Sequence, residues 1–314
     1  MSRLDRTTVA LLICLAVLLA GGPLLPRWAL FLVTISLAKG LVVLGLLLLM
    51  RTGLVSFGQG LYFAAGAYAA GTLPKGPFFA DAAVMALAGA AVAGLLAAIL
   101  GLLLARYRAI FFAMLSLAFS MILFGLLVKT SALGSTDGFN VAARTVIGVP
   151  AAGPQGRYAV FALTALAAFA VTLWMHRFLG SHLGRLAPAV RDNELRVEYM
   201  GASVRNLVHL NLVVAGVTAG LGGALTALTV GHIDPEMAYW TTSGEFVFIA
   251  ILSGAASVLA PFFGAILLEL LRSFAYEYSP NTWQLVVGGA MLAVILFLPN
   301  GLWSMFGRFR KAVR

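Results

Sequence analysis

The sequence has little charge and almost no cysteine for its length. Only 21 Lys and Arg and 11 Asp and Glu occur among 314 residues, which is 10% of the chain, whereas a soluble domain carries roughly 25%. Cys14 is the single cysteine, so an intrachain disulfide or a cysteine-based metal cluster is excluded. These shortages argue against a soluble enzyme, a disordered chain and a nucleic-acid-binding domain.

Catalytic signatures are also missing. No Gly-Lys dipeptide occurs, so the chain lacks the Walker loop that cradles phosphates, and any ATP must be hydrolysed by another protein. The four histidines form no His-Glu-x-x-His pattern, because His176 and His182 lie six residues apart while His209 and His232 are isolated. We therefore expect no enzyme, no metal site and no cofactor.

Apolar residues dominate instead. Hydrophobic side chains make up 61% of the sequence, and 34 glycines add to that share. A membrane-spanning helix needs about 20 apolar residues. Runs of that kind cover residues 7–26, 28–50, 53–71, 82–105, 109–128, 158–175, 207–230 and a long stretch from 246 onward that Glu269, Arg272 and Glu277 divide. The pattern predicts a single all-α, polytopic membrane domain over residues 1–314. A cleaved signal peptide is the alternative interpretation of the first run.

Basic residues predict which loops face the cytoplasm, because Lys and Arg accumulate on that side. Arginines are frequent in the loop at about 176–206 and in the last seven residues, whereas loop 231–244 contains Asp234 and Glu236 but no Lys or Arg. We therefore predict a cytoplasmic loop at about 176–206, periplasmic loops at about 129–157 and 231–244, and both termini in the cytoplasm.

This orientation requires three crossings after residue 244, although hydropathy alone offers two long runs. The predicted solution is a crossing over 245–259 that is broken at 253–257, where Ser and Gly interrupt the run, with the next helix starting at Pro261. A broken helix leaves backbone groups unpaired, which protein or a water-lined cavity tolerates but lipid does not. The prediction totals about ten crossings. One ordinary tilted helix with a flexible patch is the alternative.

The third run, 53–71, also mixes glycines with polar side chains at membrane depth. Polar groups there need partners, so we expect this span to be buried among other helices. Together with the broken crossing it supplies small, weakly polar groups, which suit a path that passes a solute without binding it tightly. The candidate translocation path comprises Ser56, Gln59, Tyr62, Ser253, Gly254 and Ser257. Tight helix packing is the alternative reason for such glycines, and the favoured one in run 207–230.

Lys39 stands inside the second apolar run. A charge near a helix centre costs on the order of 2.5 to 3.5 kcal/mol on insertion scales, which the surrounding Leu and Val residues can offset. We therefore expect Lys39 to face protein or water and not lipid. It is either a buried or snorkelling structural lysine or a contact to the carboxylate of a solute.

The longest polar stretch is 184–201. Leu186, Val190, Val197 and Met200 recur at helical spacing, and Gly201 is a natural stop. This pattern predicts a short amphipathic helix, or a pair of helices, outside the bilayer. A solvated loop that only fixes the topology is the alternative.

Several segments carry a family resemblance. The run Ala-Val-Arg-Asp-Asn-Glu-Leu-Arg-Val-Glu-Tyr-Met-Gly at 189–201, followed by Ala-Gly-Leu-Gly-Gly-Ala-Leu at 219–225, resembles the coupling loop of ABC importer permeases for branched-chain amino acids, of the LivH/LivM-like permease family. Segments 53–68 and 252–265 and the closing Pro-Asn-Gly-Leu at 299–302 are similar to that family too. Three features depart from it: Gln59 where the family often has His, His209 near a position usually held by Lys, and Lys39.

The resemblance implies a non-catalytic transport subunit of a bacterial inner membrane. It implies as partners a second permease of LivH type, two ATP-binding cassette subunits and a periplasmic solute-binding protein. The residues it assigns to ATPase coupling are Arg191, Asp192, Asn193, Glu194, Arg196, Glu198 and Gly201.

Other functions stay open at this point. Permeases of this type also serve urea and short-chain amides, and the sequence does not separate those solutes from leucine, isoleucine or valine. A secondary transporter would use intramembrane charges such as Lys39 or Glu269 for ion coupling. A membrane-embedded enzyme would need a catalytic constellation, and a structural assembly protein would not need broken, glycine-lined spans.

Overall fold

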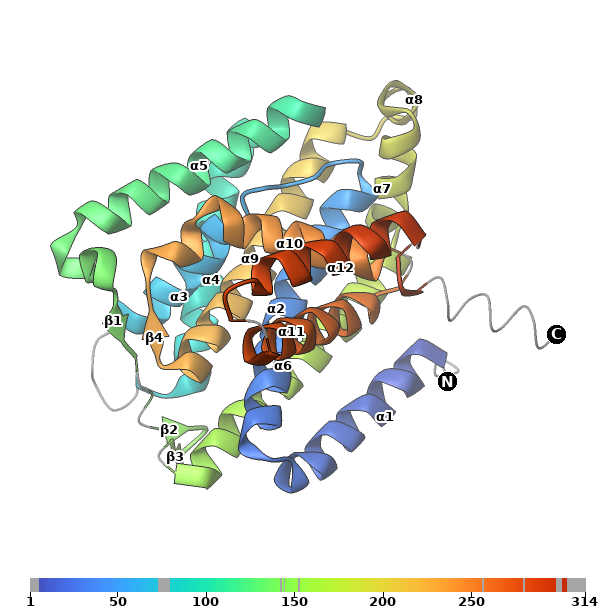
Figure 1. The fold of residues 1–314 in the computed structure, drawn as a ribbon. Coiled ribbons are helices and arrows are strands. Elements are labelled where there is room, and N and C mark those ends of the chain that lie inside the picture. Colours follow the sequence, from blue (N-terminus) through green and yellow to red (C-terminus); the bar gives the residue numbers. More distant parts are fainter. Residues whose placement is uncertain are drawn as a thin grey trace.

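The computed structural model describes residues 6–72, 80–141, 143, 145–151, 153–255, 257–278, 280–297 and 301–303. The basic tail at 308–314, the Pro-Asn of the closing motif at 299–300 and position 256 of the broken crossing lie outside the described residues. The predicted all-α architecture is confirmed, because helices make up most of the described chain and the strands are two residues long (Figure 1).

Four helices form the centre of the bundle. Helix α9 (Val204–Val230) packs against α2 (Arg27–Arg51), α3 (Gln59–Thr72) and α4 (Ala82–Leu104). Small residues let their backbones approach closely. A Cβ atom added to Gly223 would lie 1.9 Å from the carbonyl oxygen of Phe63, and one added to Gly216 would lie 2.3 Å from the Cβ of Ala97. The packing interpretation of the glycines in run 207–230 is therefore confirmed.

The outer helices are apolar and mostly exposed. They are α1 (Arg6–Gly21), α5 (Ala109–Lys129), α6 (Gly153–Gly180) and α12 (Trp283–Phe297). Within the described residues, six helices are long and apolar enough to cross a membrane, including the segment Thr7–Leu24, which is only 11% buried. Apolar side chains that face outward all along such helices fit a lipid environment, so the chain is a multi-pass membrane protein. The total of ten crossings stays a prediction.

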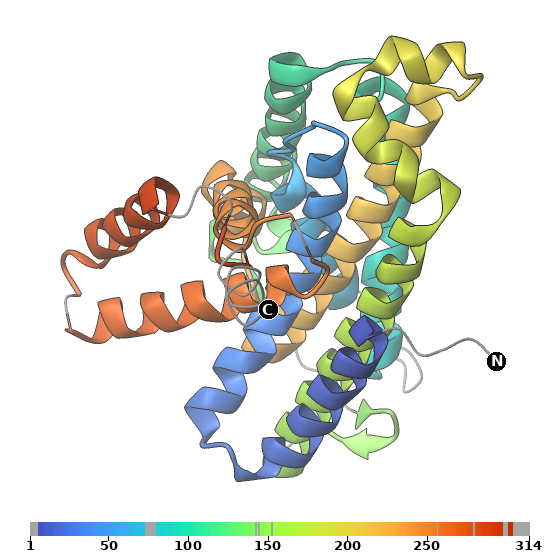
Figure 2. The same ribbon diagram turned by 90° about the vertical axis from the view of Figure 1, so that its right-hand side faces the viewer.

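The loops gather at two opposite ends of the bundle (Figure 2). One end carries α7 (His182–Asp192) and α8 (Glu194–Tyr199). The other end carries two small antiparallel sheets: β1 (Phe139–Asn140) with β4 (His232–Ile233), and β2 (Thr145–Val146) with β3 (Val149–Pro150). Single turns of 3-10 helix connect these parts at Gly22–Leu24, Ser131–Leu133, Ser135–Asp137 and Pro235–Ala238. Loop 176–206 thus lies at the opposite end of the bundle from loops 129–157 and 231–244; which end faces the cytoplasm stays a prediction.

At the same end as the sheets, Asp81 fixes the start of α4. Its carboxylate accepts hydrogen bonds from the Ala83 N–H and the Thr145 hydroxyl. Burial alone would raise the pKa of this carboxyl, but hydrogen bonds from Thr145 and from the backbone N–H groups of Ala83, Gly148 and Ile147 outweigh it and hold the pKa below its usual range. The ionised carboxylate therefore ties the β2–β3 turn to α4.

Two helices are interrupted inside the bundle. Helix α3 begins only at Gln59, because the five residues after Gly53 are not helical; Gly53, with φ +79°, ends the turn after α2. Helix α10 (Trp240–Ser253) ends at Gly254, also with φ +79°, and α11 (Ala260–Tyr278) follows. The predicted break at 253–257 is confirmed and the alternative of one tilted helix is wrong. The helical start expected near Gly53 is replaced by extended chain in which Leu54, Ser56 and Gly58 are buried and Val55 is exposed.

Helices α11 and α12 form a hairpin that extends sideways from the bundle (orange-red and red in Figure 2). The first half of α11 packs against α2 and α10, whereas α12 has no buried side chain among its described residues. The hairpin is therefore joined to the bundle mainly through α11.

Candidate functional site

The start of α3 lies in the interior of the bundle. Ser56 and Gln59 are fully buried, and Tyr62 is nearly so. Three N–H groups at the start of the helix are satisfied by hydroxyls: Phe57 donates to Ser116 Oγ at 3.1 Å, Gly58 to Ser56 Oγ at 3.2 Å and Gly60 to Ser243 Oγ at 2.9 Å. The expectation that the third run is buried among other helices is therefore confirmed. Side chains of α5 and α10 complete a helix end that water would otherwise have to solvate.

Gln59 differs from its neighbours because neither atom of its side-chain amide has a hydrogen-bond partner among the described residues. The amide of Asn211 on α9 is buried in the same state. A buried polar group without a partner costs about 1 to 3 kcal/mol. Such groups are therefore primed to bond a polar molecule that enters the bundle.

The second group of candidate path residues lies elsewhere on α10. Ser253 is buried, donates to the Ala250 carbonyl at 3.0 Å and faces Gly264 of α11, while Ser257 caps the backbone N–H of Leu259. Helix α3 contacts α10 at Ser243, which accepts from the Gly60 N–H, and Ser243 lies ten residues before Ser253, about 15 Å along a helix. The structure thus brings Ser56, Gln59 and Tyr62 together, whereas Ser253, Gly254 and Ser257 lie at the far end of α10 and just beyond it.

An ion cluster joins α2, α10 and α11 at the depth of the apolar helices. The Nζ of Lys39 lies 2.7 Å from Glu245 Oε1 and 2.5 Å from Glu269 Oε1. Arg272 Nη2 lies 2.7 Å from Glu245 Oε2, and Arg272 Nη1 lies 3.7 Å from Glu269 Oε1. The side chain of Lys39 is only 12% exposed, so the prediction that it faces protein is confirmed. Two positive and two negative charges cancel, which is how ionisable groups persist in a low-dielectric interior.

Sequence reasoning identified Lys39 and the charged residues of α11 that divide the last apolar stretch. It missed Glu245 as a partner of Lys39. The pairing joins residues 206 and 230 positions apart, and no local pattern reveals such a contact. The only available signal was charge balance: an intramembrane lysine needs a carboxylate, and few intramembrane carboxylates exist in this chain.

A cavity of about 530 Å³ adjoins this cluster, between the first half of α2 and the α11–α12 hairpin. Its walls combine two charged side chains with aromatic and aliphatic ones: Glu269, Arg272, Trp28, Phe31, Ile35 and Trp283. The guanidinium carbon of Arg272 lies 5.7 Å from the ring centroid of Trp283, within the range of a cation–π contact. Arg272 Nε is buried and has no hydrogen-bond partner within the described residues.

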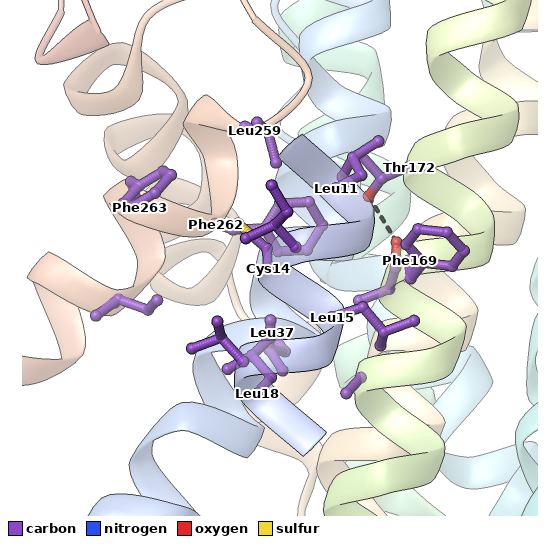
Figure 3. Close-up of a pocket in the computed structure, with 15 residues that line it drawn as sticks. Leu11, Cys14, Leu15, Leu18, Leu37, Phe169, Thr172, Leu259, Phe262 and Phe263 are labelled. Carbon is purple, nitrogen blue, oxygen red and sulfur yellow. Dashed lines mark hydrogen bonds between the residues drawn. The ribbon is translucent and has the colours of Figure 1, made fainter. Parts of the chain in front are cut away.

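A second cavity, of about 280 Å³, separates α1 from α2, α6 and α11 (Figure 3). Leucines and phenylalanines line it, among them Leu15, Phe169 and Phe262. Its one hydroxyl, on Thr172, already donates to the Ala168 carbonyl. The walls of this cavity therefore suit an apolar molecule. They provide no hydrogen-bonding partner for a charged or zwitterionic one.

The polar stretch at 184–201 forms the pair of amphipathic helices α7 and α8, as predicted. Val190 and Val197 face inward and are buried in one cluster with Leu54 of the extended chain before α3. Glu194 pairs with Arg108 of the α4–α5 loop at 2.7 Å. Asn193 caps α8 by accepting from the Arg196 N–H, and Gly201 ends the pair with φ +88°.

The seven predicted coupling residues all lie on or beside these two helices. Arg191, Asp192, Asn193, Arg196, Glu198 and Gly201 are exposed and Glu194 is half-buried. Arg191 also packs against Gly53, since a Cβ on that glycine would lie 3.3 Å from Arg191 Cγ. Sequence reasoning placed Met200 among the apolar residues at helical spacing, although it is exposed, and it missed the exposed Leu195 and Tyr199. Leu195, Tyr199 and Met200 are 64%, 90% and 66% exposed and form what we call the apolar tip.

The class of protein follows from three features of the bundle. Helices are interrupted in its apolar interior, a neutralised ion cluster lies at that depth, and a polar helix pair stands at one end. Together these features are those of a transmembrane transport protein. Comparison with known families identifies the family of transport proteins. The family described as "Branched-chain amino acid transport system / permease component" matches residues 28–296, and the chain belongs to that family. It is a transmembrane permease.

Curated relatives agree with this membership. The chain is 28% identical to the "High-affinity branched-chain amino acid transport system permease protein LivM" of Escherichia coli (strain K12), over 96% of this chain and 77% of the relative. It is 29% identical to the LivM protein of Salmonella typhimurium, over 86% and 68%. It is 26% identical to the permease protein BraD of Pseudomonas aeruginosa, over 46% of each chain. No solved structure matches.

Proposed function

We propose that the chain is a permease subunit of an ABC importer that moves branched-chain amino acids across the bacterial inner membrane. In this proposal a second permease of LivH type completes the pathway, two ATP-binding cassette subunits supply the energy and a periplasmic solute-binding protein delivers the solute. The names of the relatives support the solute class and the family supports the role as permease.

The observation that carries the coupling part of the proposal is the apolar tip on α7–α8. Leu195, Tyr199 and Met200 stand on helices rich in Arg, Asp and Glu, at the end of the bundle and outside its apolar layer. Large apolar side chains exposed side by side in a polar setting mark interaction sites. An ATP-binding cassette subunit that covers this tip would also meet Arg191, Arg196 and Glu198 around it, as an apolar centre with a charged rim.

The contacts beneath the tip support a route for the movement. Val190 and Val197 share a buried cluster with Leu54, and Arg191 lies on Gly53. A displacement of α7 and α8 would therefore press directly on the extended chain that leads to Gln59. Transmission through such a packed element is the physical requirement for coupling ATP hydrolysis to opening of a path.

For the path itself we propose Ser56, Gln59 and Tyr62, with Ser253, Gly254 and Ser257 lining a separate part of it. The unpaired amide of Gln59 supports this assignment, because it offers a donor and an acceptor to a passing solute. A solute that crosses must leave again, so weak polar groups suit the interior better than a charged cage.

The test compares two tyrosines at the same end of the bundle. Tyr199→Asp, in the apolar tip, should abolish copurification with the cassette subunits and solute-stimulated ATPase activity in nanodiscs. Tyr107→Asp, in the α4–α5 loop where Tyr107 is 40% exposed, is the matched control and should leave both intact. Full assembly and activity with Tyr199→Asp, or equal loss with both variants, would contradict docking on the tip.

Transport measurements on the reconstituted complex test the solute class. Leucine, isoleucine and valine should be taken up, and urea and short-chain amides should not. Uptake of urea without leucine would assign the chain to the amide branch of the family. Uptake that persists without cassette subunits would contradict the importer assignment and favour a secondary transporter.

A further inference from the structure

We propose that the cavity between α2 and the α11–α12 hairpin binds the solute as a zwitterion, with its carboxylate on Arg272, its ammonium group on Glu269 and its aliphatic side chain against the aromatic wall. This inference rests on the proposed function and adds to it a substrate-binding site in the permease itself. It is a site distinct from the weakly polar path around Gln59.

The two charged side chains present complementary free atoms. Glu269 uses Oε1 for both Lys39 and Arg272, and its Oε2 makes no hydrogen bond among the described residues. The side chain of Arg272 is 35% exposed; its Nη2 pairs with Glu245, while its Nη1 lies 3.7 Å from Glu269 Oε1, too far for a hydrogen bond. Because Glu269 and Arg272 are three residues apart on α11, their side chains lie on one helix face. One free acceptor and one free donor therefore stand next to each other at the cavity wall.

The charge balance of the cluster selects the kind of ligand. Lys39, Arg272, Glu245 and Glu269 sum to zero, so a ligand with a net charge would leave an uncompensated charge in a low-dielectric region. A zwitterion adds no net charge and still bonds both free atoms. Amino acids with neutral side chains meet this condition, whereas amines, carboxylic acids and the basic or acidic amino acids do not.

The remaining walls fit an aliphatic side chain. Trp28, Phe31 and Ile35 come from consecutive turns of α2, and Trp283 closes the opposite side at the start of α12. The cavity of about 530 Å³ leaves ample room for a leucine-sized molecule, and apolar walls with a few converging polar groups are typical of ligand sites. Urea and short amides would gain little from these walls.

The position of the cavity fits an early step of import. Helix α2 runs from the end with the strands to the end with α7 and α8 (Figure 2). Residues from its first half line the cavity. In the predicted orientation that half is the periplasmic one. A solute released there by a binding protein would meet this cavity before the interior of the bundle.

The binding test uses the purified full-length chain in nanodiscs of phosphatidylcholine and phosphatidylglycerol. Saturation-transfer NMR detects millimolar ligands, the range we expect for a site that must release its solute. Leucine should bind, and 4-methylpentanoate, which lacks the ammonium group, and 3-methylbutylamine, which lacks the carboxylate, should bind at least about tenfold more weakly. Equal binding of all three would overturn the proposal. So would loss of the leucine signal when phosphatidylethanolamine is added, because the cavity would then hold a lipid headgroup.

Neighbouring residues on α11 locate the site without disturbing the ion cluster. Ser273 lines the cavity and Phe274 does not, and both are exposed. Ser273→Trp should fill the cavity and weaken leucine binding at least about tenfold, while Phe274→Trp should bind as the parent does. Circular dichroism and size-exclusion chromatography check that both variants fold.

The outcomes separate this site from the function on which it rests. If the assembled importer moves leucine and Ser273→Trp binds and transports like the parent, the site is wrong and the function stands. If the chain binds leucine in a manner sensitive to Ser273→Trp but the complex moves no amino acid, the function is wrong and the site stands.

Discussion

Lys39 and Glu245, 206 residues apart in the chain, form an ion pair of 2.7 Å inside the apolar bundle. Glu269 completes the coordination of the same Nζ. The pair joins the middle of α2 to the first half of the interrupted helix α10. Lys39 is the only lysine in the central helices α2, α3, α4 and α9. Its structural role is therefore to hold the interrupted helix α10 in place.

Replacing Lys39 by Met should destabilise the fold strongly, because Glu245 and Glu269 then share only Arg272 and one negative charge stays uncompensated. Breaking a buried pair from one side costs roughly 3 to 5 kcal/mol. The double variant Lys39→Met, Glu269→Gln removes one of the two carboxylates and should recover part of the loss. Thermal unfolding in detergent measures both, and an unfolding temperature of Lys39→Met equal to that of the parent would refute the structural role.

Reversing the charge of Glu194 tests two contacts. This residue pairs with Arg108, and it also lies on the surface proposed to couple to the cassette subunits. The pair is partly exposed, with side chains 28% and 38% accessible, so it stabilises the fold by only about 0.2 to 1 kcal/mol. Glu194→Arg alone should impair assembly with the cassette subunits. The swap Glu194→Arg with Arg108→Glu restores the internal pair. Assembly that recovers in the swap shows that Glu194 acts through Arg108, and assembly that stays impaired shows a direct contact.

Enlarging Gly223 should damage the centre of the bundle. The added methyl group of Gly223→Ala would lie 1.9 Å from the Phe63 carbonyl oxygen, and overpacking of this kind costs about 1 to 3 kcal/mol. Gly125→Ala on α5 is the control, because nothing lies within 4 Å of its Cβ position. The unfolding temperature should fall for the first variant and stay level or rise for the second. Equal temperatures would mean that α3 and α9 are less tightly packed than described.

Acid should weaken the end of the bundle that carries the strands. The folded pKa of Asp81 lies below its usual value, so the stabilisation it gives is present above the unfolded pKa of about 3.9 and is lost as the pH falls through the folded pKa. Asp81→Ala should cost about 1 kcal/mol at neutral pH, as the loss of a helix cap does. The difference in unfolding temperature between parent and variant should shrink below about pH 4; a difference that stays constant into strong acid would contradict it.

Part of this arrangement was predictable from the sequence. The break at Ser253 was signalled by Ser and Gly in an apolar run, and the amphipathic pair α7–α8 by residues such as Val190 and Val197 at helical spacing. The extended chain before Gln59 was not predictable, because a short apolar segment has the same composition in extended and helical form. The partner of Lys39 and the cavity beside Arg272 arise from tertiary contacts across more than 200 residues, and local periodicity carries no information about them.

The backbone contacts at the bundle centre decide where motion can occur. Where Gly66 of α3 meets Gly220 of α9, and Gly223 meets Phe63, no side chain lies between the two backbones. Side chains can change rotamer and let helices slide, but backbones in direct contact can only separate or stay together. Gly222 of α9 likewise meets the Ala38 carbonyl of α2, and Gly89 of α4 meets the Gly66 carbonyl. Helices α2, α3, α4 and α9 therefore behave as one rigid block. Any alternation between inward-open and outward-open forms must come from the parts held by long side chains, above all α10 and the hairpin of α11 and α12.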